Sequence, residues 1–197
     1  SLKFIFQGTK FQPWVGGKDL ILYIIGKIGV DGARYKAMEF AGEGIRSLSM
    51  DNRLTMCNMA IEAGAKAGII EPDDITLQYV QARAKREYKI YTSDPDASYE
   101  KIFEFRSEDI PLQVAFPHLP ENTKTVEEAS GLKIDQVVIG SCTNGRLEDL
   151  EVTAAILKGK KIHPGIRCLI FPGTQDIYLE ALRRGWIETM VEAGAAV

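Results

Sequence analysis

Cys142 is the residue of this chain whose sequence surroundings most favour chemistry. It lies within Gly140-Ser-Cys-Thr-Asn-Gly-Arg146, after the apolar run 137–139 and before a helix-like segment at 147–158. A strand followed by a helix places the cysteine just beyond the carboxyl end of the strand, where open α/β sheets bind their ligands. Amides at the start of a helix favour an anion, so a thiol there is expected to be biased toward thiolate.

The residues alone leave three interpretations of Cys142 open: a small buried residue at a tight turn, a metal ligand, or a catalytic nucleophile. A nucleophilic cysteine needs a nearby base, and the chain contains two histidines, His118 and His163. The first lies in a proline-rich loop and the second on an expected surface turn, so neither has a sequence-level claim on Cys142. Cys57 and Cys168 have apolar neighbours and are expected in the core. Without a CxxC, the chain carries no complete metal site of familiar spacing.

Asn58 and Glu62 form a second candidate pair. They are spaced i, i+4, so they share one face of a helix expected from about 53 to 66, with caps at Asp51-Asn52. That helix is apolar over most of its circumference, which predicts burial. One interpretation is that the pair contacts a substrate or supports a site. The alternative is that both side chains cap backbone groups in the core, because an unpaired buried carboxylate is costly.

The remaining pattern supplies the elements that must position these residues. The second half of the chain alternates strand and helix, which predicts a parallel sheet covered by helices. Three prolines between 110 and 122 suggest a crossing between two domains. The expected strands are 2–6, 35–42, 88–94, 102–105, 136–139 and 167–171, and the expected helices are 19–28, 53–66, 75–85, 147–158, 176–184 and 187–192.

Composition excludes several classes of partner. A chain of 197 residues, 45% of them hydrophobic, can bury a core in one or two domains. A net charge of −3 and no long basic run argue against a nucleic-acid or membrane-surface partner. Three widely spaced cysteines and no signal-peptide pattern predict a cytoplasmic protein. The chain starts without Met in strand-like sequence, so we expect it to begin inside a longer protein.

Two stretches together resemble the aconitase superfamily, in its branch of 3-isopropylmalate dehydratase large subunits and homoaconitases. The stretch Gly140–Asp149 is similar to the iron–sulfur motif, and Thr55–Ala65 is similar to a second characteristic helix of the family. The resemblance covers nearly the whole chain. Supporting stretches are Lys18-Asp-Leu-Ile-Leu22, Glu39-Phe-Ala-Gly42 and Phe171-Pro-Gly-Thr-Gln175.

The resemblance implies an α/β fold of three-layer α/β/α domains, with a mixed or parallel sheet flanked by helices. It assigns residues 1–118 to an aconitase-like second domain, with the end of the preceding domain at 1–12. Residues 119–197 would begin the third domain and carry the first cluster cysteine. The chain is then expected to be a middle fragment of a subunit, which stops just before the family's CxxC.

The activity that the resemblance implies is that of a hydro-lyase. In this family three cysteines hold a [4Fe–4S] cluster whose open iron acts as a Lewis acid, and Cys142 matches the first ligand. Asn58 and Glu62 match polar residues that line the cluster and substrate pocket. A separate small subunit provides the catalytic serine.

The implied reaction converts 2-isopropylmalate into 3-isopropylmalate by dehydration and rehydration, in leucine biosynthesis. The alternative is homoaconitase or another hydro-lyase of the family that acts on a related 2-hydroxy acid. In isolation the fragment is expected to be an inactive structural domain that holds no stable cluster, because one thiolate cannot replace three.

Overall fold

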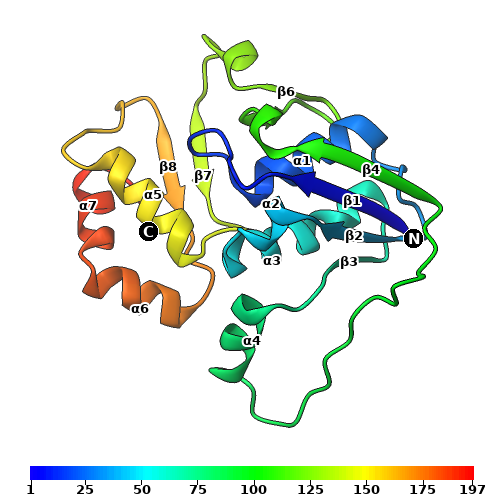
Figure 1. Ribbon diagram of the computed structural model, residues 1–197. Helices are drawn as coiled ribbons and strands as arrows, with labels where there is room; N and C mark the ends of the chain where they lie inside the picture. Colours follow the sequence, from blue (N-terminus) through cyan, green and yellow to red (C-terminus); the bar gives the residue numbers. More distant parts are fainter. The chain divides into compact units, whose positions relative to one another are not determined.

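The strand β1 (Leu2–Gln7) lies in the middle of a four-stranded parallel sheet. The computed structural model describes residues 1–197, and Figure 1 shows the sheet with its strands in the order β3-β2-β1-β4. The neighbours of β1 are β2 (Ala37–Ala41) and β4 (Lys101–Arg106), and β3 (Ala67–Ile70) pairs with β2. All of the pairings are parallel, so the chain must cross back over the sheet between successive strands.

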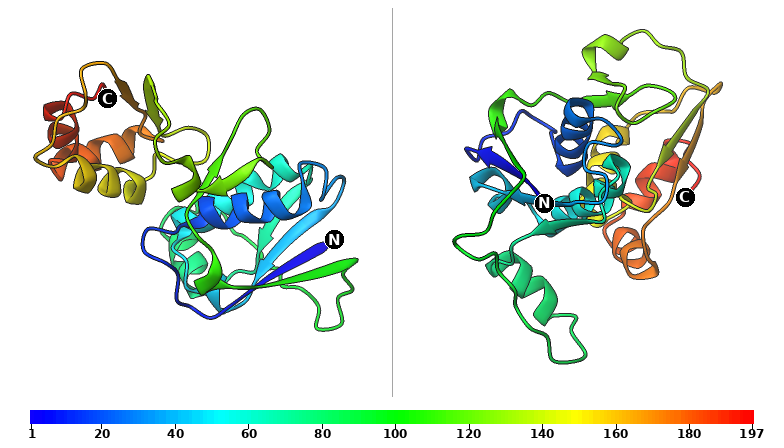
Figure 2. Two further views of the ribbon diagram at one scale, coloured as in Figure 1. Left: turned by 90° about the horizontal axis from the view of Figure 1, so that it is seen from above. Right: turned by 90° about the vertical axis from the view of Figure 1, so that its right-hand side faces the viewer.

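One face of this sheet forms the first hydrophobic core. The register places Phe4 opposite Phe40 on one side and Phe103 on the other, and the Phe4 and Phe103 rings stack with centroids 4.9 Å apart. The helix α1 (Gly17–Ile28), which connects β1 to β2, contributes four fully buried side chains to the same core and lies against the sheet in Figure 2. These four are Leu20, Ile21, Ile24 and Ile25.

The connection from β2 to β3 contains α2 (Glu43–Arg46), α3 (Met50–Asn58) and the 3-10 helix η1 (Met59–Ala63). Ser49 caps α3 by accepting a hydrogen bond from the Asn52 backbone amide, and Gly64 ends η1 in the left-handed conformation. The single helix predicted at 53–66 is therefore two shorter elements that begin earlier and end at Gly64.

The segment between β3 and β4 corrects another prediction. The helix α4 (Asp74–Gln81) forms as expected and is capped by Asp73, but residues 88–94 form no strand and are exposed. No strand of the sheet pairs with residues 88–94, and their apolar side chains Tyr88, Ile90 and Tyr91 are exposed, so no core holds them as a strand. The segment is instead held to the sheet by Ser93 and Tyr99, which donate hydrogen bonds of 2.8 and 2.6 Å to Glu39 Oε2.

The proline-containing segment after β4 packs on α1. It includes η2 (Ser107–Asp109) and the antiparallel strands β5 (Gln113–Ala115) and β6 (Thr123–Thr125), followed by η3 (Glu127–Ala129). The Gln113 amide donates a 2.8 Å hydrogen bond to Asp19 of α1. Residues 110–122 therefore belong to the first unit, Ser1–Ser130, and the second unit is Gly131–Val197. Assignment of the two units to particular domains of a family stays a prediction.

The second unit has the predicted strand–helix alternation. Its strands β7 (Gln136–Ile139) and β8 (Arg167–Ile170) are parallel, and its helices are α5 (Leu147–Leu157), α6 (Gln175–Arg183) and α7 (Trp186–Glu192). Its own core is formed by Leu150, Ala154, Cys168, Ile170, Ala181, Ile187, Met190 and Ala195.

Both units confirm the predicted α/β class, with parallel strands flanked by helices. The dipeptide Asn144-Gly145 is typical of hairpin turns, but a helix follows it here. None of the helices combines the length and the apolar composition that crossing a lipid bilayer requires.

Candidate functional site

Cys142 lies on a tight loop, residues 140–146, between β7 and α5. The Ser141 amide donates to the Asn144 carbonyl at 3.3 Å, which closes the loop on itself. Gly140 and Gly145 form its two ends, with φ angles of +91° and +90°. A Cβ atom on either glycine would collide with the Phe171 carbonyl oxygen, so only glycine allows this close approach.

Asp149 holds the loop to the start of α5. One of its carboxylate oxygens accepts hydrogen bonds of 2.9 Å from the backbone amides of Gly145 and Arg146, and the other accepts a 3.0 Å bond from the Asn144 side chain. Both amides therefore donate their hydrogen bonds to Asp149. That the start of the helix biases the Cys142 thiol toward thiolate stays a prediction.

The structure excludes the interpretation of Cys142 as a buried turn residue, because its side chain is exposed. Within the second unit, no histidine pairs with the thiol. His163 uses Nδ1 to accept a 3.1 Å hydrogen bond from the Gly165 amide, and His118 lies exposed in the turn between β5 and β6. Within its own unit Cys142 is thus a solvent-accessible thiol without an adjacent histidine, which favours the ligand interpretation over the nucleophile.

The other two cysteines are confirmed as core residues. Cys57 on α3 packs against the first core, and burial raises the pKa of its thiol to about 11. Cys168 on β8 is 6% exposed, and burial raises the pKa of its thiol as well. Burial therefore favours the neutral thiol at both positions, in keeping with their place in the two cores.

The donor set does not fit a complete [4Fe–4S] site within this chain. No group of three or more His, Cys, Asp or Glu side chains is placed to hold a metal ion, and a cluster of this type needs three cysteine thiolates here. Of the three cysteines, Cys142 alone presents an exposed thiol that could serve as one ligand.

Asn58 and Glu62 are exposed, which corrects the prediction of a buried helix around them. Asn58 ends α3 and Glu62 lies in η1, while Met59, Ala60 and Ala63 of the same turns are buried. The turn from 58 to 63 is therefore amphipathic and turns its two polar side chains to the solvent. Because neither polar group is buried, the alternative that they cap backbone groups in the core loses its basis.

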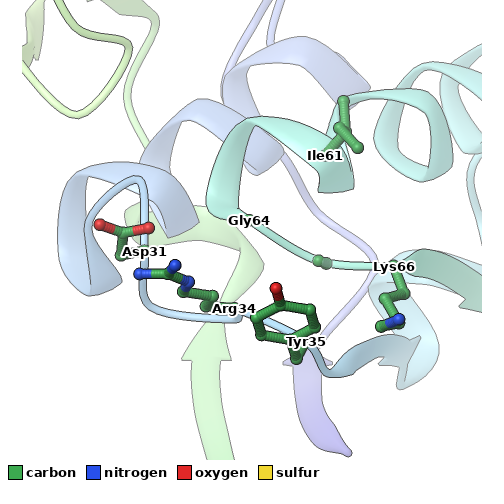
Figure 3. Close-up of a pocket in the computed structure, with 7 residues that line it drawn as sticks. Asp31, Arg34, Tyr35, Ile61, Gly64 and Lys66 are labelled. Carbon is green, nitrogen blue, oxygen red and sulfur yellow. The ribbon is translucent and has the colours of Figure 1, made fainter.

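A surface pocket of about 500 Å³ lies beside the same turn. Figure 3 shows Tyr35 between Arg34 and Lys66, whose charged groups lie 5.7 and 5.1 Å from the centre of the Tyr35 ring. Asn58 and Glu62 do not line this pocket. Its lining consists of Asp31, Arg34, Tyr35, Ile61, Gly64, Ala65 and Lys66.

Arg146 is a residue of the loop that the sequence did not single out. Its side chain is partly buried, and its Nε atom is buried without any hydrogen-bond partner. Its place directly before the helix could have identified it from the sequence. Arg146 is the N-cap residue of α5, where Ser, Thr, Asp or Asn is preferred because their side chains accept hydrogen bonds from helix amides. An arginine cannot do so.

The chain is similar to proteins of known family along its whole length. The model of the aconitase family (aconitate hydratase) matches residues 1–131 and 123–197. The 3-isopropylmalate dehydratase large subunit of Desulfitobacterium hafniense (strain Y51) is 68% identical over all 197 residues. Proteins of the same name from Thermoanaerobacter sp. (strain X514) and Thermodesulfovibrio yellowstonii are each 61% identical over the same length. The chain spans about half the length of these relatives, 47% in each case.

Proposed function

The chain belongs to the aconitase family, and from this membership we propose that it is part of the large subunit of a 3-isopropylmalate dehydratase. The whole protein would be a hydro-lyase that converts 2-isopropylmalate into 3-isopropylmalate by dehydration and rehydration, in leucine biosynthesis. The similarity to large subunits of that name supports the proposal, because it extends over every residue of the chain.

The exposed thiol of Cys142 is the observation that carries this proposal. It sits on a rigid loop at the carboxyl end of β7, where α/β proteins place their ligands, and it is the one cysteine of the three that is exposed. We propose that Cys142 provides one of three thiolate ligands of a [4Fe–4S] cluster in the whole protein, and that the other two lie outside this chain. Asn58 and Glu62, both exposed, are proposed to line the same cluster and substrate pocket.

The proposal extends to domains and partners. Residues 1–118 would be the second aconitase-like domain, and residues 119–197 would begin the third. The partner would be the small subunit that completes the dehydratase, and the substrate would be a 2-hydroxy acid. We place the complex in the cytoplasm, in keeping with reduced cysteines.

The test uses the full-length large subunit assembled with its small subunit. We expect turnover of 2-isopropylmalate, loss of turnover and of cluster iron in Cys142→Ser, and retention of both in the matched control Cys168→Ala. Equal losses in the two variants would contradict the ligand assignment. Turnover of a homoaconitase substrate in place of 2-isopropylmalate would contradict the proposed reaction and leave the family unchanged.

The 197-residue chain by itself is expected to be a folded domain without activity. Anaerobic reconstitution followed by iron and sulfide analysis should find no stoichiometric cluster, because a single exposed thiolate is available. About four irons bound per chain would show that the ligand set proposed above is wrong.

A further inference from the structure

The Nε atom of Arg146 is the one buried side-chain nitrogen or oxygen of this loop that has no hydrogen-bond partner. It is buried and has no acceptor, although leaving a buried donor without a partner destabilises the folded state, and more so when the group is charged. Natural proteins retain such a group when an acceptor arrives from outside the fold, or when it acts in binding. The position of Arg146, four residues after Cys142 and at the end of the same loop, makes binding the interpretation to pursue.

The neighbouring acceptors of the loop are already engaged by other donors. Asp149 uses both carboxylate oxygens on the Asn144 side chain and on the backbone amides of Gly145 and Arg146. The side-chain oxygen of Asn144 accepts a 2.9 Å hydrogen bond from the Thr143 hydroxyl, and the Gly145 carbonyl accepts a 2.7 Å bond from Gly173. Each of these acceptors therefore already has a donor, whereas Arg146 Nε has no acceptor.

We propose that Arg146 binds a carboxylate group of the substrate beside Cys142. An arginine presents Nε and one terminal nitrogen as a planar pair of donors, which matches the two oxygens of a carboxylate. Part of the side chain is exposed, and so are the neighbouring Ser141 and Cys142, so a small acid can reach the exposed part from solvent, and pairing with the buried Nε as well requires the guanidinium to turn. The ligand class is a 2-hydroxy dicarboxylate, and this assignment rests on the function proposed above.

The anchoring of the loop explains how Arg146 would be held ready for binding. Its backbone amide is fixed by Asp149, and Gly145 before it is fixed against Phe171 and Gly173. The base of the side chain is therefore set before the substrate arrives, which lowers the ordering cost of binding. The role is recognition and positioning of the acid rather than proton transfer, because a guanidinium stays protonated at any working pH.

The test measures equilibrium binding to the full-length large subunit in complex with its small subunit. The probes are 2-isopropylmalate and each of its two monomethyl esters. In the wild type, one of the two esters should bind more weakly because its carboxylate no longer pairs with Arg146. In Arg146→Gln we expect the diacid to lose about 10- to 100-fold in affinity, and the discrimination against that ester to disappear.

Two further variants separate binding from structure. Arg146→Lys keeps the charge without the planar pair of donors, so it should recover part of the affinity. Arg167→Gln is the matched control, an exposed arginine at the opposite end of β8 from the loop, and should bind all three probes as the wild type does. Melting temperature and cluster iron should be the same in all variants.

Unchanged binding of the diacid in Arg146→Gln would overturn the proposal. A fall in melting temperature or cluster iron with discrimination between diacid and ester preserved would also overturn it, and would assign Arg146 a structural partner instead. If Arg146→Gln does not fold, the proposal requires that Arg146→Lys discriminates less than the wild type between the diacid and that ester. If the wild-type complex turns over a different 2-hydroxy dicarboxylate, the proposed reaction fails, and the same measurement with that acid and its esters still decides the role of Arg146.

Discussion

Asn144 and Asp149 are joined by a 3.0 Å hydrogen bond between the amide nitrogen of one side chain and a carboxylate oxygen of the other. Asn144 belongs to the loop that carries Cys142, and Asp149 belongs to the first turn of α5. Asp149 also accepts hydrogen bonds from two backbone amides of the loop. Through these contacts the first turn of the helix fixes the conformation of the loop. The cysteine is therefore positioned by a residue seven places later in the sequence.

Asp149→Ala should loosen this loop. The variant removes three hydrogen bonds at the start of α5, so we expect a loss of about 1–2 kcal/mol in the free energy of unfolding, typical of a lost helix cap. Hydrogen exchange should show faster exchange of the Gly145 and Arg146 amides. The control is Glu151→Ala, which removes an exposed carboxylate from the same helix. Equal exchange rates in the two variants would show that Asp149 does not hold the loop.

The ion pair of Arg53 with Asp73 is the second anchor, and it joins α3 to α4. The buried guanidinium donates two hydrogen bonds, of 2.6 and 2.7 Å, to the two oxygens of Asp73. Asp73→Asn leaves this charge buried without its counter-ion, so we expect a loss on the order of 3 kcal/mol in denaturant unfolding. Asp74→Asn, at an exposed neighbouring carboxylate, is the control.

Acid should weaken the same ion pair. The hydrogen bonds from Arg53 lower the pKa of Asp73 below its ordinary value of 3.8. A carboxyl whose pKa is lowered in the folded state stabilises the protein above its unfolded pKa, and this contribution is lost as the pH falls toward the folded pKa. Below about pH 4, stability should therefore fall less steeply in Asp73→Asn than in the wild type. Parallel pH profiles would exclude Asp73 as the source.

The three cysteines should react at different rates with a thiol reagent. Cys142 is exposed, whereas a pKa of about 11 leaves Cys57 as thiolate in only about one molecule in a thousand at pH 8. Mass spectrometry after brief treatment of the folded chain with iodoacetamide should find Cys142 modified first. In denaturant all three should react alike. Faster modification of Cys57 or Cys168 in the folded chain would contradict the burial described here.

Trypsin should cut the folded chain first within residues 83–89. This stretch holds four exposed basic residues outside any helix or strand, and exposed loops of this kind are the preferred sites of proteolysis. The two fragments should stay together, because β4 pairs with β1 over six residues. Gel filtration followed by denaturing electrophoresis checks both points. Separation of the fragments would show that the pairing of β4 with β1 is not enough to hold them together.

Glu62→Gln should affect the activity of the whole complex without affecting its stability. Glu62 is exposed, so its neutralisation should change the free energy of unfolding by no more than about 0.5 kcal/mol. If it lines the substrate pocket as proposed, turnover should fall on the order of a hundredfold. Glu87→Gln, an exposed carboxylate in the loop before β4, is the control. A large drop in melting temperature with turnover intact would return Glu62 to a structural role.

The sequence by itself determined the local features of this protein. Apolar periodicity located α1, β1, β4 and the whole β7–α5–β8 series, because side-chain spacing within an element is a property of consecutive residues. Residue type at a fixed place in that series singled out Cys142 as a candidate for chemistry, and the resemblance to the family made it the candidate cluster ligand. The motif around it also identified the family, which the similarity to known proteins then confirmed.

Tertiary structure decided everything that depends on residues distant in the sequence. The strand predicted at 88–94 did not form because a strand needs both a paired neighbour and a buried face, and residues 88–94 have neither. The exposure of Asn58 and Glu62 depends on which side of α3 and η1 meets the sheet. The structure also shows that Arg146 Nε lacks a hydrogen-bond partner, whereas Asp149, Asn144 and Gly145 are all paired. Which polar groups are paired depends on the folded loop and cannot be read from residue types alone.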